Sequence, residues 1–240
     1  MHNAAFRAVG LEWTYELLEV APAELPAVLD RLKAPDVAGA NVTIPYKQSV
    51  MEHLDSIADD ALRARAVNTI VNEGGRLEGF NTDIAAIRLA LDEVGVKPHG
   101  ANAVILGAGG AARAAAQALV GAHITFLTRH PEDAVLPGKA VGWDDPGAAA
   151  SSRSADVLVN ATPLGRREEM PLRPAALPQR GAVIDLVYVT GGTPLVRKAR
   201  SLGLRTADGW GVLLSQGATA FQLWTGKPAP LEAMRDTLQP

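Results

Sequence analysis

The 240-residue sequence predicts an α/β protein with a doubly wound parallel sheet. Asn102–Leu106 is a short apolar run typical of a buried parallel strand, and a glycine-rich turn and an alanine-rich segment follow it. Three more apolar runs, Ile124–Thr128, Val157–Ala161 and Val183–Val187, alternate with turn or helical segments, a pattern that favours parallel strands joined by helices. The length suits one large domain or two modest ones, and 48% hydrophobic residues suffice for a buried core.

Short β-branched runs also alternate with helical patterns in the first third of the chain, and helical patterns return at its end. In chain order these predicted elements are a strand at Thr14–Val20, a helix at Pro22–Leu32, a strand at Ala40–Ile44, a helix beginning at Pro45, a helix at Asp55–Ala66, paired strands at Val67–Asn72 and Arg76–Phe80, and helices at Val212–Trp224 and Leu231–Leu238. We expect a domain boundary near Asp83, where the polar motifs of the first third give way to a glycine-rich segment.

Composition excludes several classes of function. With 23 basic and 26 acidic residues the net charge is −3, so nothing favours electrostatic binding of nucleic acid or of an anionic membrane. A chain without cysteine forms no disulfide, thiolate nucleophile or cysteine-ligated metal site. The five histidines lack the spacing of metal ligands, so we expect no metal. Apolar stretches are shorter than the roughly 20 residues of a membrane span and no signal peptide is seen, so we expect a cytoplasmic protein.

A dinucleotide fingerprint follows the strand predicted at Asn102–Leu106 and precedes a helix. Gly107 allows a tight turn, Gly109 lets backbone amides approach a pyrophosphate, and Ala112 permits close packing of helix on strand. The helix N-terminus adds unpaired N–H groups and the positive end of its dipole. The residues expected to contact the cofactor here are Gly107, Ala108, Gly109, Gly110 and Ala111. The alternative is a Gly/Ala-rich turn that serves packing alone.

The end of the next strand favours NADP over NAD. An NAD site usually has a carboxylate about 20 residues after the glycines, to hold the adenosine ribose. Here the strand ends in Thr128 and Arg129, and an arginine binds a 2′-phosphate through two hydrogen bonds. Two alternatives stay open: Glu132 or Asp133 folds back to the ribose, or Arg129 is a solvated surface residue.

Three polar clusters stand at the ends of predicted elements in the first third of the chain: Asn41–Lys47, Ala66–Thr69 and Gly79–Asp83. A single lysine or Asn-Thr pair is usually a solvated residue or a turn. Strand ends, however, are where α/β sheets present site residues. Lysine with aspartate makes a workable proton-transfer pair, and asparagine and threonine can donate to substrate hydroxyls.

In order along the chain, these clusters and several later motifs resemble the shikimate dehydrogenase family. The matching segments are Asn41–Lys47, Ala66–Thr69, Gly79–Asp83, Gly107–Ala112, Asn160–Gly165, Asp185-x-x-Tyr188 and Gln216–Gly226. The resemblance implies an NADP-dependent oxidoreductase that reversibly reduces 3-dehydroshikimate to shikimate in aromatic amino-acid biosynthesis. It also implies a substrate domain of residues 1–83 that the C-terminal helices of residues 212–240 complete, with residues 84–211 as the dinucleotide-binding domain. A small-molecule substrate and a monomer or homodimer are implied as well. An NAD-dependent quinate/shikimate dehydrogenase is the alternative within the same class.

Residue roles follow from the same resemblance. Lys47 matches the family's catalytic lysine and Asp83 its partner carboxylate. As an ammonium, Lys47 is expected to stabilise the developing alkoxide and deliver its proton; Asp83 favours that charge, and burial disfavours it. The residues implied to contact substrate are Thr43, Lys47, Asn68, Asp83, Tyr188 and Gln216. Those implied to contact the cofactor, besides the fingerprint, are Arg129, Thr162, Leu186 and Gly209.

One departure from the family pattern bears on substrate binding. The family has a strand and a loop with two carboxylate-binding serines before Met-His-Asn, and the sequence starts at Met1-His2-Asn3. From this we expect normal NADP binding and weak shikimate binding. The corresponding alternative function is a catalytically impaired, cofactor-binding form of the enzyme.

Overall fold

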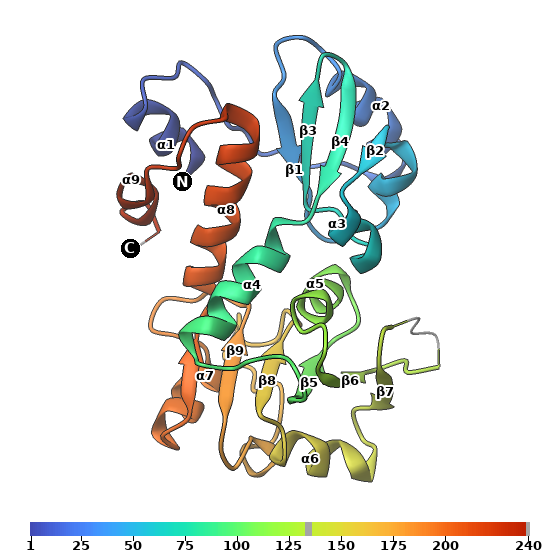
Figure 1. Ribbon diagram of the computed structural model, residues 1–240, viewed down its shortest axis with the longest axis vertical. Helices are drawn as coiled ribbons and strands as arrows, with labels where there is room; N and C mark the ends of the chain where they lie inside the picture. Colours follow the sequence, from blue (N-terminus) through green and yellow to red (C-terminus); the bar gives the residue numbers. More distant parts are fainter. Residues whose placement is uncertain (133–135, 239–240) are drawn as a thin grey trace. The chain divides into compact units, whose positions relative to one another are not determined.

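The computed structural model describes residues 1–132 and 136–238, and it forms two compact units. The first unit comprises Met1–Thr82 and Leu214–Pro240, and the second comprises Asp83–Leu213. Each unit has its own sheet, as Figure 1 shows.

A six-stranded, all-parallel sheet forms the centre of the second unit, in the order β10-β9-β8-β5-β6-β7. The strands are β5 (Asn102–Leu106), β6 (His123–Thr128), β7 (Lys139–Gly142), β8 (Val157–Asn160), β9 (Ala182–Asp185) and β10 (Arg205–Ala207). The chain builds outward from β5 through β6 to β7, then returns to the other side of β5 for β8, β9 and β10. This is the predicted doubly wound sheet, and its switch point lies between β5 and β8.

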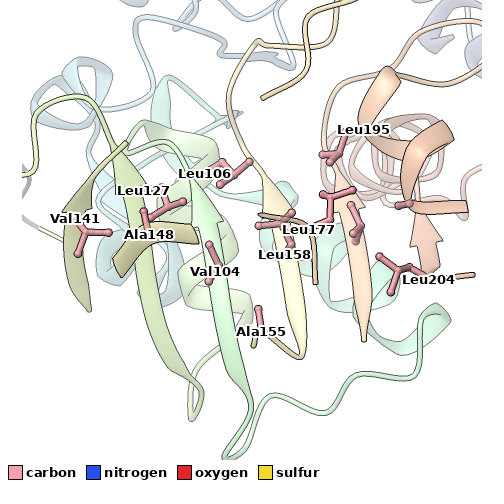
Figure 2. Packing of buried hydrophobic residues seen from close by; sticks show 12 residues of the cluster. Val104, Leu106, Leu127, Val141, Ala148, Ala155, Leu158, Leu177, Leu195 and Leu204 are labelled. Atoms are coloured by element: carbon pink, nitrogen blue, oxygen red, sulfur yellow. The ribbon is translucent and has the colours of Figure 1, made fainter. Parts of the chain in front are cut away.

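Alternate residues of these strands form one buried face. Val104, Leu158 and Val183 are register partners in a row across the sheet, and Leu106 pairs with Leu127 in the next row. They pack in one cluster with side chains of the surrounding helices, as Figure 2 shows. The helices of this unit are α4 (Thr82–Glu93), α5 (Gly110–Ala118), α6 (Pro146–Arg153) and α7 (Pro194–Ser201), with the 3₁₀ turn η3 (Pro174–Ala176).

The first unit contains a smaller, mixed sheet in the order β1-β3-β4-β2. Its strands are β1 (Gly39–Asn41), β2 (Ser56–Ile57), β3 (Thr69–Glu73) and β4 (Arg76–Phe80), and β3 and β4 pair antiparallel as expected. Its helical segments are α1 (His2–Ala8), η1 (Pro22–Glu24), α2 (Leu25–Arg31), η2 (Ser49–His53), α3 (Asp59–Ala64), α8 (Gly209–Thr225, from Leu214 onward) and α9 (Leu231–Arg235).

The C-terminal helices complete this first unit, which confirms the predicted fold class. Phe221 of α8 and Met234 of α9 are fully buried with Phe6 of α1 in one apolar cluster. Trp224 Nε1 donates a hydrogen bond to the carbonyl of Ile70 in β3, at 2.9 Å. Segments from both ends of the chain therefore share one core.

The strand predicted at Thr14–Val20 is wrong, because residues 11–20 have no regular secondary structure. A β-strand needs a hydrogen-bonding neighbour, and β1 pairs only with β3 among the described residues. Leu17 and Leu18 are 91% and 58% exposed, so the β-like pattern of this segment does not reflect burial against a core.

Two helix predictions in the first third are also wrong in part. The segment that begins at Pro45 is a series of turns followed by the short helix η2, because the Lys47 carbonyl accepts a hydrogen bond from Val67 N, at 2.7 Å. In the segment 55–66, only α3 is helical. Asp55 instead pairs with Leu77: its N–H donates to the Leu77 carbonyl at 2.9 Å, and its Oδ2 accepts from Leu77 N at 2.7 Å.

Candidate active site

Backbone hydrogen bonds bring the predicted substrate residues of the first unit together. Val42 N donates to the Asn68 carbonyl at 2.8 Å, and Val67 N donates to the Lys47 carbonyl at 2.7 Å. Thr43 therefore lies beside Asn68, and Lys47 lies beside Val67, the residue before Asn68. Thr43 is exposed and Lys47 half-buried, so both can be reached by a ligand.

Asn68 is held in one orientation by its neighbours. Its Oδ1 accepts hydrogen bonds from the hydroxyl of Thr69 at 3.0 Å and from the N–H and hydroxyl of Thr82, at 2.8 and 3.2 Å. Because three donors converge on Oδ1, the amide NH₂ is the end that can donate to a substrate hydroxyl. The next residue after Thr82 is Asp83, a half-buried carboxylate in the first turn of α4.

Asn41 is a further candidate for the substrate site. It belongs to the motif Asn41–Lys47, but the sequence alone assigned it no role. Its Nδ2 donates to Thr69 Oγ1 at 3.1 Å and to the Asn68 carbonyl at 3.3 Å, while its Oδ1 accepts from the Tyr15 hydroxyl at 3.0 Å. His2 is buried against Tyr15, with ring centroids 4.6 Å apart, and burial lowers its pKa to about 4. The imidazole of His2 is therefore neutral at pH 7.

Asn81 is a second candidate of this kind. It is buried, its Nδ2 donates to the Ala66 carbonyl at 2.8 Å, and its Oδ1 is buried without a hydrogen-bond partner among the described residues. A buried unpaired oxygen of this kind needs an explanation, and a donating ligand provides one. Gln216, the remaining predicted substrate residue of this unit, lies half-buried on α8.

The cofactor residues predicted in the second unit follow the carboxyl ends of its parallel strands, where α/β sheets bind ligands. Gly107 directly follows β5 with φ +103°, and a Cβ there would lie 3.2 Å from the Ala161 carbonyl oxygen and from Thr162 Cγ2. Gly109 is the N-cap of α5, no side chain caps the helix there, and nothing lies within 4 Å of the position that a Cβ would take. The first turn of α5 therefore presents amide groups with room for an anion, which fits a pyrophosphate.

Arg129 follows β6 and is exposed, as a residue that binds a 2′-phosphate should be. Of the two carboxylates that could take the ribose instead, Glu132 lies 3.6 Å from His130 Nδ1, and Asp133 lies outside the described residues. Arg129 remains the residue predicted to bind the 2′-phosphate, and the two carboxylates remain the alternative.

Four other predicted site residues follow β8, β9 and β10: Thr162 after β8, Leu186 and Tyr188 in the loop after β9, and Gly209 at the start of α8. Leu186 directly follows β9, and Ala161 separates Thr162 from the end of β8. Gly209 packs so closely on the Leu186–Val187 backbone that a Cβ would lie 2.5–2.8 Å from its atoms. Tyr188, 40% exposed, has its ring centroid 5.2 Å from that of Trp210. The second unit thus brings Thr162, Leu186 and Gly209 to the edge that holds the glycine fingerprint.

Residues 1–132 and 136–238 lack the features of two other classes of protein. No helix of these segments combines the length and the apolar character needed to cross a membrane. Within the same segments, no three His, Cys, Asp or Glu side chains are grouped as metal ligands.

Known proteins are similar to this chain over its whole length. The family description "Shikimate dehydrogenase substrate binding domain" matches residues 1–70, and "Shikimate 5'-dehydrogenase C-terminal domain" matches residues 209–239. Shikimate dehydrogenase (NADP(+)) of Moorella thermoacetica is 43% identical, over 100% of this chain and 87% of its own length. The corresponding protein of Methanothermobacter thermautotrophicus is 40% identical, over 100% of this chain and 90% of its own.

A solved structure extends this similarity to three dimensions. Shikimate 5-dehydrogenase of Thermus thermophilus, in complex with NADP(H) and shikimate, superposes with a TM-score of 0.87 at 36% identity. The match covers 99% of this chain and 91% of that one.

Proposed function

The chain belongs to the shikimate dehydrogenase family, and we propose on this basis that it catalyses the reversible, NADP-dependent reduction of 3-dehydroshikimate to shikimate. It is an oxidoreductase that acts on a CH–OH group. The observation that carries this function is the near-complete match to a family member that binds both NADP(H) and shikimate. The relatives named above use NADP, which favours that cofactor over NAD.

We propose that the substrate is bound by Thr43, Lys47, Asn68, Asp83, Tyr188 and Gln216. The orientation of Asn68, with three donors on its Oδ1, supports a role in donating to a ring hydroxyl. The ammonium of Lys47 stabilises the alkoxide that develops on the substrate and supplies its proton. Asp83 is proposed as the partner carboxylate of Lys47 in this proton transfer.

The second unit is proposed to hold NADP through the amides of Gly107–Ala111 and through Thr162, Leu186 and Gly209, with Arg129 on the 2′-phosphate. Bound NADPH supplies the hydride. The uncapped start of α5 and the open space at Gly109 support this assignment. We further propose a monomer or homodimer in the cytoplasm, which light scattering of the purified protein and fractionation of cells would test.

The function is tested by steady-state turnover of the purified protein with shikimate or quinate and with NADP or NAD. Turnover of shikimate with NADP well above the other three combinations is expected. Faster turnover of quinate, or of either substrate with NAD, would show that the proposed specificity for shikimate and NADP is wrong. Absence of turnover in all four combinations would overturn the enzymatic function itself.

A further inference from the structure

Asp185 is a fully buried carboxylate that no step of the proposed reaction uses. It ends β9, is 0% exposed, and burial raises the pKa of its carboxyl group, an effect that its hydrogen bonds oppose. Its Oδ1 accepts from Asn160 Nδ2 at 2.9 Å and from Val187 N at 3.0 Å, and its Oδ2 accepts from the Thr193 hydroxyl at 2.6 Å. Asn160 Nδ2 and Val187 N can only donate, so Oδ1 has to be an acceptor.

Asn160, at the end of the neighbouring strand β8, uses both ends of its side chain. Its Nδ2 also donates to the Leu164 carbonyl at 3.0 Å, and its Oδ1 accepts from the N–H and hydroxyl of Thr162, at 3.1 and 2.7 Å. The loop from 160 to 165 is therefore wrapped around one amide group. Rotating that amide by half a turn would face its oxygen toward the Leu164 carbonyl and the Asp185 carboxylate, so Asp185 selects a single orientation.

The same carboxylate holds the loop that follows β9. Val187 N is bound to Asp185, and Leu186 N donates to the Asn160 carbonyl at 3.0 Å. Thr193, whose hydroxyl donates to Asp185, also accepts from Val196 N at 3.2 Å and so caps α7. Asp185 is thus the point where two loops and a helix start are joined.

Both loops lie against residues that the proposed function gives to the cofactor. A Cβ on Gly107 would lie 3.2 Å from the Ala161 oxygen and from Thr162 Cγ2, in the first loop. A Cβ on Gly209 would lie 2.6 Å from the Val187 oxygen and 2.8 Å from the Leu186 oxygen, in the second. A shift of either loop would therefore change the surface next to the glycine fingerprint or next to Gly209.

From these contacts we propose that Asp185 is a positioning residue for NADP: through Asn160, the Val187 amide and the Thr193 hydroxyl it sets the conformation of the loops that carry Thr162 and Leu186. The proposal rests on the proposed function of these loops. It assigns Asp185 no contact with substrate, cofactor or reacting atoms.

The first test is Asp185→Asn, which keeps the shape of the side chain and removes its charge. Its NH₂ can face Thr193, which leaves one oxygen for Asn160 and Val187 but weakens both bonds, because hydrogen bonds to charged groups are the stronger ones. We expect the dissociation constant and the KM for NADP to rise about tenfold, one decade for about 1.4 kcal/mol. The KM for shikimate should change less than the KM for NADP, since among the residues assigned to substrate only Tyr188 lies in one of the two loops.

Val183→Ala serves as the matched control. Val183 is fully buried on the same strand and belongs to the apolar cluster of the sheet, with no contact to the loop hydrogen bonds. The cavity should lower the melting temperature while NADP affinity stays at the wild-type value. If Asp185→Asn behaves in the same way, with lower stability and unchanged NADP affinity, Asp185 is merely structural and the proposal is overturned.

A second pair of variants covers the case in which Asp185→Asn fails to fold. Thr193→Ser keeps the hydroxyl that binds Asp185, and Thr193→Val removes it at nearly constant volume. Weaker NADP binding by Thr193→Val, restored in Thr193→Ser, supports the proposal; equal NADP affinity of the two overturns it. All binding is measured by calorimetry with NADP alone, so loss of shikimate turnover by the wild type would count against the proposed function and not against this inference.

Discussion

Replacing Gly209 with alanine would place a methyl group against the backbone of the Leu186–Val187 loop. The ideal Cβ position is 2.5 Å from the Val187 carbonyl carbon, 2.6 Å from its oxygen and 2.8 Å from the Leu186 oxygen. The loop cannot easily withdraw, because Val187 N is bound to Asp185 Oδ1 at 3.0 Å and Leu186 N is bound to the Asn160 carbonyl at 3.0 Å.

Gly211, two residues later in the same helix, provides the matched control because nothing lies within 4 Å of its Cβ position. Alanine in place of glycine stabilises a helix by about 0.5–1 kcal/mol, so Gly211→Ala should stabilise the protein by that amount. At Gly209 an overlap of about 1 Å with backbone atoms is set against this gain, since carbon atoms normally stay roughly 3.5 Å apart. Overpacking costs about 1–3 kcal/mol. Because both variants gain the same helix propensity, Gly209→Ala should be less stable than Gly211→Ala by about this overpacking cost.

Thermal unfolding followed by circular dichroism measures the effect. For a chain of this size a difference of about 2 kcal/mol corresponds to roughly 4–8 °C between the two melting temperatures. Calorimetric titration should show weaker NADP binding only for Gly209→Ala, because only that substitution displaces the loop after β9. Equal melting temperatures and equal NADP affinities would refute the reasoning, since the loop would then yield to a methyl group without cost.

Three further predictions concern single residues. Lys47→Ala should lower kcat for shikimate by about 10²–10⁴ with NADP affinity intact, because a general acid is lost; the exposed Lys97→Ala is the control, and a change in shikimate KM alone would make Lys47 a binding residue. Arg129→Ala should weaken NADP about 10–100-fold and leave NAD binding nearly unchanged, and equal losses in titrations with both cofactors would show that the arginine does not bind the 2′-phosphate. In the folded protein the pKa of His2 is about 4, below its ordinary value of 6.5. As the pH falls from 6.5 toward 4, the unfolded chain therefore takes up a proton first, and the folded protein loses the stability that it has above pH 6.5. Denaturant unfolding between these pH values should therefore show that a His2→Phe variant loses less stability than the wild type, by up to about 3 kcal/mol, and parallel losses would place the titrating group elsewhere.

Strands buried in the parallel sheet were predictable because their signal is local. Asn102–Leu106 was predicted to the residue, since a strand covered on both faces is a continuous apolar run bounded by turn residues. The antiparallel pair Thr69–Glu73 and Arg76–Phe80 was predictable as well, because Gly74 and Gly75 both adopt positive φ at its turn. Local turn residues thus locate these elements, although the first strand of the pair lies at Thr69–Glu73 and was predicted at Val67–Asn72.

Other elements depend on partners that are distant in sequence. Thr14–Val20 has the composition of a strand but no neighbour that would pair with it among the described residues. Ser56–Ile57 lies in a segment with a helical pattern and becomes a strand, because it pairs with β4 more than 20 residues later. Propensity within a window contains no information about such pairing.

For the candidate site, the sequence by itself determined which side chains are available: the glycines at 107 and 109, Lys47, Asn68, Asp83 and Arg129 all stand in recognisable motifs. It did not determine which of them are held in one orientation. Asp185 and Asn160 are 25 residues apart and meet only because β8 and β9 are parallel neighbours whose last residues are register partners. A hydrogen bond between side chains depends on distance and direction in space, so the tertiary structure alone decided that Asn160 shapes one loop, that Asp185 joins it to the next, and that Gly209 has no room for a side chain.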